Sequence, residues 1–173
     1  EVVLVARTES ALIELATELE AKGVEAHIVV ADLTKMIDVT RVVETIRQKG
    51  PFQYLINNAG FSTLGAFAEQ DPQTQHNMVA LHITAVIELS SAALGGMIEQ
   101  GKGFIVNVSS LTSLLPMASV AVYGGTKAFL NNYSEGLQSE VAQQGVKIQS
   151  LCPGYTRTGF HTTGTFTGFD ASR

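Results

Sequence analysis

The sequence predicts a doubly wound α/β fold, in which helices cover both faces of a parallel sheet to form a three-layer sandwich. Short apolar runs alternate with longer amphipathic segments along the 173 residues. Short apolar runs are typical of parallel strands buried on both faces, and their alternation with helical patterns indicates strand–helix–strand units. The length and a hydrophobic fraction of 45% fit one domain, residues 1–173, with a sizeable core.

The predicted strands are the apolar runs, which are rich in valine and isoleucine. They comprise residues 2–5, 26–30, 52–56, 104–108 and 147–151. Each run is shorter than an ordinary helix, and β-branched residues favour strands. The strands are predicted to be parallel, because a helical pattern separates each run from the next.

The predicted helices occupy the segments between these runs. Leucines at positions 12, 15 and 19 lie on one face of a helix over residues 8–22, and Gly23 provides its C-cap. A second helix ends before Gly50-Pro51. The remaining predicted helical segments are residues 34–49, 72–100 and 122–144.

Ser110, Tyr123 and Lys127 form the set of side chains that says most about chemistry. Tyr123 and Lys127 are four residues apart, so they share one face of a helix. A lysine ammonium beside a tyrosine favours the phenolate, which would bring a pKa of about 10 down towards neutral pH. Tyr123 is therefore predicted to act as a general acid or base, with the Ser110 hydroxyl holding the substrate oxygen.

Three further motifs each follow an apolar run. They are Asp32-Leu33, Asn57-Asn58-Ala59-Gly60 and Pro153-Gly154. Together with Ser110, Tyr123 and Lys127, this ordered set resembles the short-chain dehydrogenase/reductase family, and in particular its single-domain, ketoacyl-reductase-like branch. The resemblance covers about residues 2–160 and implies a Rossmann-type fold.

The resemblance implies an oxidoreductase that passes a hydride between a nicotinamide and a carbonyl or alcohol carbon. Tyr123 would exchange the proton of the substrate oxygen, Lys127 would favour the ionised tyrosine and bind the nicotinamide ribose, and Ser110 would polarise the carbonyl. His82 stands where the family has a fourth catalytic residue, an asparagine that helps to hold a proton-relaying water. Because histidine titrates near neutral pH, two hypotheses stay open: His82 contributes to the relay, or it merely packs.

The residues after the first apolar run predict the cofactor. Members of the family that use NAD usually end this strand with an acidic residue, whereas this chain has Ala6 followed by Arg7. A guanidinium suits a 2′-phosphate, so NADP(H) is predicted in preference to NAD(H). By resemblance, the other cofactor contacts are Asp32, Leu33, Asn58, Ala59, Gly60, Tyr123, Lys127, Pro153, Gly154 and Thr158.

The family's opening strand and glycine-rich pyrophosphate turn have no counterpart in this sequence. The chain begins at what would be the second strand, and the family's last strand is missing too. Since the first strand of a doubly wound sheet lies between the second and the fourth, the sheet is expected to be split, with two apolar edges exposed. The expectation is a domain truncated at both ends, from a longer protein.

Substrate and assembly are predicted only in outline. Leu114, Leu115 and Met117, together with Phe160 and Phe166, would make the pocket apolar and suited to a small hydrophobic ketone or aldehyde. Residues 158–173 are rich in threonine and glycine, which predicts a mobile substrate loop. In the family, the two long helices form the oligomer interface, so a homodimer or homotetramer is expected.

Composition narrows the class of protein. A net charge of −5 argues against nucleic acid as a partner. No run of 18 apolar residues predicts a membrane span. The lone Cys152 fits a reducing, cytoplasmic setting, and the histidines at 27, 76 and 161 show no paired ligands, so no metal site is predicted.

Two alternatives to a reductase remain. A non-catalytic relative that binds a nucleotide or a partner protein would explain His82 and the missing glycine turn, but the intact Ser110, Tyr123 and Lys127 oppose it. An epimerase or dehydratase of the extended branch also uses Tyr-x-x-x-Lys, but the segment Asn57–Gly60 argues against that branch.

Overall fold

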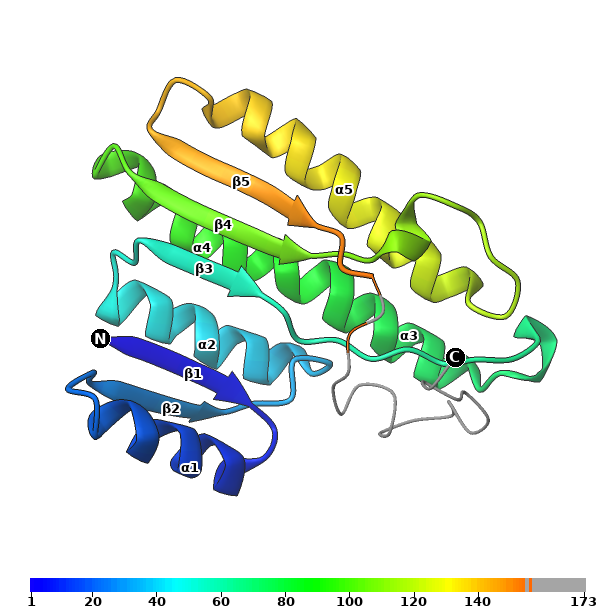
Figure 1. Cartoon of the computed structure of the whole chain (residues 1–173), viewed down its shortest axis with the longest axis horizontal. Coiled ribbons are helices and arrows are strands. Elements are labelled where there is room, and N and C mark those ends of the chain that lie inside the picture. Colours follow the sequence, from blue (N-terminus) through cyan, green and yellow to red (C-terminus); the bar gives the residue numbers. More distant parts are fainter. Residues whose placement is uncertain (155, 157–173) are drawn as a thin grey trace.

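The computed structural model describes residues 1–154 and residue 156, in which strands and helices alternate as predicted (Figure 1). The strands are β1 (Val2–Ala6), β2 (Ala26–Val30), β3 (Tyr54–Asn57), β4 (Gly103–Val108) and β5 (Val146–Leu151). The α-helices are α1 (Glu9–Glu20), α2 (Met36–Lys49), α3 (Pro72–Val79), α4 (Ala85–Glu99) and α5 (Ala121–Val141). Every predicted strand and helix is present, with ends shifted by a few residues at most.

The strand pairs are parallel, but within the described residues they form two separate sheets. β1 pairs with β2, and β3, β4 and β5 pair in that order. In Figure 1, β1 and β3 are the strands that face each other between the two sheets. The predicted split of the sheet is therefore observed, and Tyr54 and Ile56 of β3 are exposed apolar side chains.

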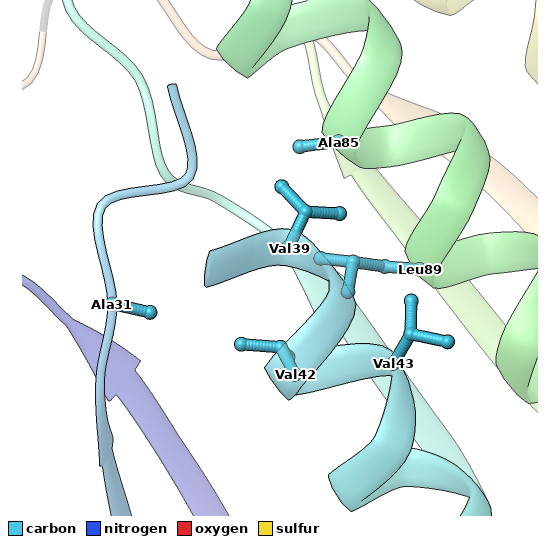
Figure 2. Close-up of a cluster of buried hydrophobic side chains, with 6 residues drawn as sticks. All are labelled: Ala31, Val39, Val42, Val43, Ala85 and Leu89. Atoms are coloured by element: carbon cyan, nitrogen blue, oxygen red, sulfur yellow. The ribbon is translucent and has the colours of Figure 1, made fainter. Parts of the chain in front are cut away.

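A cluster of buried aliphatic side chains joins the two sheets. On α2, Val39, Val42 and Val43 follow the i, i+3, i+4 spacing of one helix face; Val39 and Val43 lie towards α4, and Val42 points towards Ala31 (Figure 2). The cluster comprises Ala31, Val39, Val42, Val43, Ala85 and Leu89, with Val5 of β1 and Leu55 of β3 packed against it. Burial of each valine or leucine contributes about 1.5–3 kcal/mol, so helix packing holds together two sheets that share no hydrogen bonds.

A buried polar layer fixes the ends of the central strands. Asn57 Nδ2 donates hydrogen bonds to Asn107 Oδ1 at 2.8 Å and to Ser90 Oγ at 3.2 Å. Asn107 Nδ2 in turn donates to Ser134 Oγ at 2.9 Å. These bonds tie β3 and β4 to α4 and α5. Each buried polar group left without its partner would lower the stability of the fold by about 1–3 kcal/mol. Asn57 is therefore a structural residue that sets where residues 58–60 leave the sheet.

The long helix predicted over residues 72–100 is continuous but irregular. Asp71 caps its start by accepting hydrogen bonds from the Gln73 and Thr74 amides, and Pro72 occupies the first turn. Between α3 and α4, Ala80–Thr84 forms a π-helical turn, η2, a rare conformation found mostly at functional sites. By length and composition the stretch Pro72–Glu99 is a candidate membrane span. Met78, Leu89 and Met97 of this stretch are buried against the rest of the chain, as in the core helix of a globular fold, whereas Val79 and Ile87 are exposed.

Candidate active site

The carboxyl ends of the parallel strands bring the predicted site residues to one edge of each sheet. At the end of β4, the Ser109 amide donates to the Leu151 carbonyl oxygen at 2.7 Å. One residue past Ser110, the Leu111 amide donates to the Pro153 carbonyl oxygen at 3.2 Å. The segment after β5 therefore lies beside the serine loop, which is the arrangement that parallel strands create for ligand sites.

The two serines at the end of β4 have different partners. Ser109 is buried, and its hydroxyl donates to the Lys127 carbonyl oxygen at 2.8 Å, so it anchors α5. Ser110 Oγ accepts hydrogen bonds from the Thr112 amide and hydroxyl, and the Ser110 side chain also hydrogen-bonds Tyr123. Of the two serines, Ser110 is thus the one placed to share a substrate oxygen with the tyrosine.

Tyr123 lies in the first turn of α5 and is almost fully buried. Burial raises the pKa of its phenol, and the hydrogen bond with Ser110 only partly opposes that effect. The prediction that the phenol pKa is lowered is wrong for the chain by itself, because removal from water destabilises the phenolate more than the neighbouring groups stabilise it. Tyr123 is consequently protonated at neutral pH.

Lys127 is a buried lysine, with a relative exposure of 4%. Its Nζ donates a hydrogen bond to the Val108 carbonyl oxygen at 2.7 Å and lies 5.7 Å from the centroid of the Tyr123 ring. Burial lowers the pKa of Lys127 to about 8, because the ammonium is poorly solvated. The predicted pairing of tyrosine and lysine on one helix face is present, and the lysine exchanges its proton close to neutral pH.

His82 lies in the middle of the π-helical turn and is 1% exposed. Its Nε2 lies 3.2 Å from the Phe61 amide, and its Nδ1 lies 2.9 Å from Thr126 Oγ1. Burial, together with the positive charge of Lys127, lowers its pKa to about 3. The hypothesis that His82 gains and loses a proton near neutral pH is contradicted, because a cation is too poorly solvated there.

The first and second strands end in residues suited to an adenosine phosphate. Arg7 is exposed directly after β1. At Asp32, partial burial raises the pKa, but hydrogen bonds from Thr34 and then the charges of Lys35 and Arg7 outweigh it, so the net pKa is lowered. Arg7 and Asp32 are therefore close enough to interact. Leu33 is half-buried against the α2–α4 cluster.

Residues 58–60 and 153–154 border the same edge. Asn58 and Ala59 are exposed after β3, whereas Gly60 lies against the His82 ring: a Cβ at position 60 would be 2.9 Å from Nε2. A Cβ at Gly154 would be 3.3 Å from Leu111 Cδ1. Only small residues allow these close approaches. The predicted cofactor residue Thr158 lies outside the described residues.

Side chains of the predicted substrate wall flank the serine loop. Leu111, Leu114, Leu115 and Met117 are all more than half exposed, an unusual group of free apolar residues beside Ser110. The other members of that prediction, Phe160 and Phe166 of the 158–173 segment, lie outside the described part of the chain.

Thr126 is a site residue that the sequence analysis missed. It is buried, contacts His82 through its hydroxyl, and donates to the Tyr123 carbonyl oxygen at 2.8 Å. Its position directly before Lys127 and three residues after Tyr123 puts it on the inner face of the same helix. That spacing could have flagged Thr126 beforehand, although its partner His82 is 44 residues away.

The prediction that His27 has no paired ligands is wrong. His27 Nε2 lies 3.0 Å from a Glu1 carboxylate oxygen and 3.2 Å from one of Glu25. Lys49 Nζ is also 3.1 Å from His27 Nε2, so a cation already occupies this exposed cluster. The contacts form a surface ion-pair network, to which we assign no metal.

Comparisons with known proteins match this arrangement. The family model described as short chain dehydrogenase matches residues 1–165. An uncharacterized oxidoreductase of Staphylococcus saprophyticus is 30% identical over 160 residues, which cover 91% of this chain and 68% of that protein.

Solved structures agree with the fold. A short-chain dehydrogenase from Sphingobium yanoikuyae in complex with NADPH superposes with a TM-score of 0.88 at 34% identity, covering 92% of this chain and 63% of its own. A bulky-bulky ketone specific alcohol dehydrogenase from Comamonas testosteroni gives a TM-score of 0.85 at 35% identity, covering 90% and 62%. The chain thus spans about two thirds of the length of these three proteins. The motifs, the fold and the family match agree, and the chain belongs to the short-chain dehydrogenase/reductase family.

Proposed function

We propose that the protein is an NADP(H)-dependent oxidoreductase that reduces a carbonyl compound, or oxidises the matching alcohol, with Tyr123 as the general acid or base. The observation that carries the proposal is the position of three side chains at the carboxyl edge of β4: Ser110 lies close enough to Tyr123 to affect its pKa, and the buried Lys127 Nζ lies 5.7 Å from the centroid of the tyrosine ring. Proton transfer to a substrate oxygen requires this combination of a donor, an orienting hydroxyl and a nearby cation.

Tyr123 supplies the proton in the reducing direction. Its raised pKa keeps the phenol protonated at neutral pH, so the hydroxyl can donate its proton to the oxygen of a bound carbonyl. The Ser110 hydroxyl orients the same oxygen. NADPH, when bound, supplies the hydride that reaches the carbonyl carbon.

Lys127 completes the proton balance. After Tyr123 has given up its proton, the phenolate needs a nearby cation and a source of protons. A lysine with a pKa of about 8 meets both needs near neutral pH. The hydrogen bond to the Val108 carbonyl oxygen uses one of the three N–H donors of the Lys127 ammonium. The other two could bind the nicotinamide ribose and return a proton to Tyr123.

The residues at the strand ends fit the two ends of NADP. The exposed guanidinium of Arg7 and the small Ala6 suit a 2′-phosphate, whereas a carboxylate there would repel it. Asp32 and Leu33 would hold the adenine, and residues 58–60 the adenosine. At the other end, Pro153, Gly154 and, outside the described residues, Thr158 would contact the nicotinamide amide.

Several related structures support the preference for NADP. The structure from Sphingobium yanoikuyae contains NADPH, and other neighbours were solved with NADP or NADPH. The exposed Arg7 of this chain is an independent argument, because it lies directly after β1, where the proposal places the ribose phosphate.

The proposed substrate is a small apolar ketone or aldehyde. The exposed leucines and methionine after Ser110 offer it an apolar wall. The relative from Comamonas testosteroni is named for bulky ketones, which supports the ketone class but not the small size. A homodimer or homotetramer built through α4 and α5, and a cytoplasmic location, remain predictions for the whole protein.

A cofactor titration followed by a substrate screen tests the proposal. The protein is titrated with NADPH and NADH by cofactor fluorescence, and apolar ketones and aldehydes are screened by the loss of NADPH absorbance. Tight NADPH binding with turnover of an apolar ketone is expected. NADPH binding without turnover of any carbonyl, unchanged in a Tyr123→Phe variant, would instead indicate a nucleotide-binding protein that has lost catalysis.

A further inference from the structure

His82 connects two segments of the site that come from different parts of the chain. On one side of the imidazole lies the turn after β3, which carries Gly60 and Phe61. On the other side lies the first turn of α5, which carries Tyr123 and Thr126. The ring contacts are 6.0 Å to the Phe61 ring and 5.8 Å to the Tyr123 ring, measured between centroids.

The hydrogen bonds of this bridge have only one consistent direction. The Phe61 amide can only donate, so His82 Nε2 must be the acceptor of that 3.2 Å bond. The proton of a neutral ring is then on Nδ1, which donates to Thr126 Oγ1 at 2.9 Å. The Thr126 hydroxyl is left free to donate to the Tyr123 carbonyl oxygen, 2.8 Å away. The chain of bonds therefore runs from the Phe61 amide to the Tyr123 backbone without a break.

The bridge requires a neutral ring and close packing. A doubly protonated imidazole has no acceptor, so protonation would break the bond from Phe61. At Gly60, a Cβ would stand 2.9 Å from His82 Nε2 and 3.6 Å from Lys127 Nζ, so the turn lies directly on the imidazole. The π-helical turn Ala80–Thr84 carries His82 at this buried point between β3 and α5.

We propose that His82 is a positioning residue: a neutral strut that holds the cofactor-facing turn at residues 58–61 against the helix turn carrying Tyr123. The proposal rests on the reductase function proposed above. In this role the side chain joins the two segments through two fixed hydrogen bonds, one to the Phe61 amide and one to Thr126. It sets the distance between the nucleotide and the proton donor, and it keeps its Nδ1 proton rather than passing it on.

The two nitrogen atoms can be tested separately. In His82→Asn, the side-chain amide can still donate from the Nδ1 position to Thr126 but cannot reach Phe61. In His82→Gln, the amide oxygen can still accept from Phe61 near the Nε2 position, but Thr126 loses its bond to residue 82 and keeps only the one to the Tyr123 carbonyl oxygen. His82→Leu removes both bonds.

The expected kinetic result is a crossed pattern. His82→Asn should weaken NADPH binding about ten-fold, the size of one lost hydrogen bond, and retain most of kcat. His82→Gln should retain NADPH affinity and lose about ten-fold in kcat, and His82→Leu should lose both. Thr126→Val should lose kcat and retain NADPH affinity, as His82→Gln does, and Thr126→Ser should restore kcat. The control is Thr17→Val, at an exposed threonine. Parallel losses of affinity and kcat in the Asn and Gln variants would overturn the proposal.

A readout without turnover keeps the strut separate from the reductase proposal. Nitrogen NMR of the free protein at neutral pH should show His82 protonated on Nδ1 only. Hydrogen exchange should show the Phe61 amide protected in the wild type and in His82→Gln, but not in His82→Asn or His82→Leu. A ring protonated on Nε2, or equal Phe61 protection in all the variants, would refute the strut even if the enzyme is active. If these signals appear and no carbonyl is reduced, the reductase proposal fails and the structural bridge stands.

Discussion

The Lys127 ammonium donates a 2.7 Å hydrogen bond to the carbonyl oxygen of Val108, the last residue of β4. This bond fastens the tyrosine helix to the strand that ends two residues before Ser110. It also explains how a buried lysine is tolerated, because one of its donors is satisfied by the backbone. The position of Lys127 leads to the first prediction.

Lys127 should make the stability of the protein rise at alkaline pH. Its pKa is about 8 when folded and 10.5 when unfolded, so between these values the unfolded chain binds more protons. The free energy of unfolding should therefore increase with pH in this window, by about 3 kcal/mol. Urea unfolding at pH 7.5 and pH 10 would measure it, with Lys127→Met as the comparison. An equal pH response in both proteins would show that Lys127 titrates normally.

The same titration should shape the pH dependence of reduction. The value of kcat/KM reports groups of the free enzyme, and the titratable groups at the site are Tyr123, Lys127 and the neutral His82. Since Tyr123 has a raised pKa, the group that loses its proton first is Lys127. We expect kcat/KM for carbonyl reduction to be level below neutral pH and to fall above about pH 8. A rate that rises through pH 9 would assign proton donation to another group.

Removal of the Tyr123 hydroxyl should abolish reduction but not cofactor binding. A general acid contributes about 10²–10⁴-fold, so kcat for Tyr123→Phe should fall at least 10²-fold while the NADPH dissociation constant changes little. Tyr133→Phe is the matched control, because this half-buried tyrosine of the same helix bonds Ser90 rather than Ser110. Comparable losses in the two variants would point to a general packing defect.

Arg7 should decide between the two nicotinamide cofactors. Loss of a charged hydrogen bond to a phosphate costs about 1.5–3 kcal/mol, so Arg7→Ala should weaken NADPH binding about 10–100-fold and leave NADH binding nearly unchanged. The control is Arg47→Ala, since Arg47 is also an exposed arginine but lies on α2. Fluorescence titration of both cofactors gives the answer, and an equal effect on NADPH and NADH would exclude recognition of the 2′-phosphate.

His82 should make the protein sensitive to acid. Its pKa is about 3 when folded and 6.5 when unfolded, so below pH 6.5 the unfolded chain binds the additional proton. Stability should fall as the pH decreases from 6.5 towards 3, by an amount on the order of 5 kcal/mol. Denaturation curves at pH 7 and pH 4.5 should show a smaller loss in His82→Asn, which cannot titrate. If the wild type and the variant lose the same stability, the ring is protonated in the folded state as well.

Local patterns were sufficient to predict the elements and most of the candidate site. The short apolar runs marked β1 to β5, because parallel strands buried on both faces are short and mostly apolar. The leucine spacing before Gly23 marked α1, and the i, i+4 spacing of Tyr123 and Lys127 placed both on one face of α5. Ser110 was also predicted from the sequence, and in the structure it lies beside Tyr123, whereas the neighbouring Ser109 donates to the Lys127 backbone.

The predictions that went wrong concern quantities that depend on burial. Proximity of a lysine suggested a lowered pKa for Tyr123, but removal from water raises it. The same effect keeps His82 neutral, where its residue type suggested titration near pH 7. His27 looked unpaired because its partners Glu1 and Glu25 come from the start of β1 and the loop before β2.

The sequence by itself determined the order of strands and helices, the family, and which residue types meet at the strand ends, because these depend on short-range spacing. The tertiary structure alone decided the protonation of Tyr123, Lys127 and His82 and the bridge from Phe61 through Thr126 to Tyr123. Those properties arise from groups 21 and 44 residues away from His82, which meet only when the chain is packed. Solvation and long-range contacts are set by the fold as a whole, and no local pattern records them.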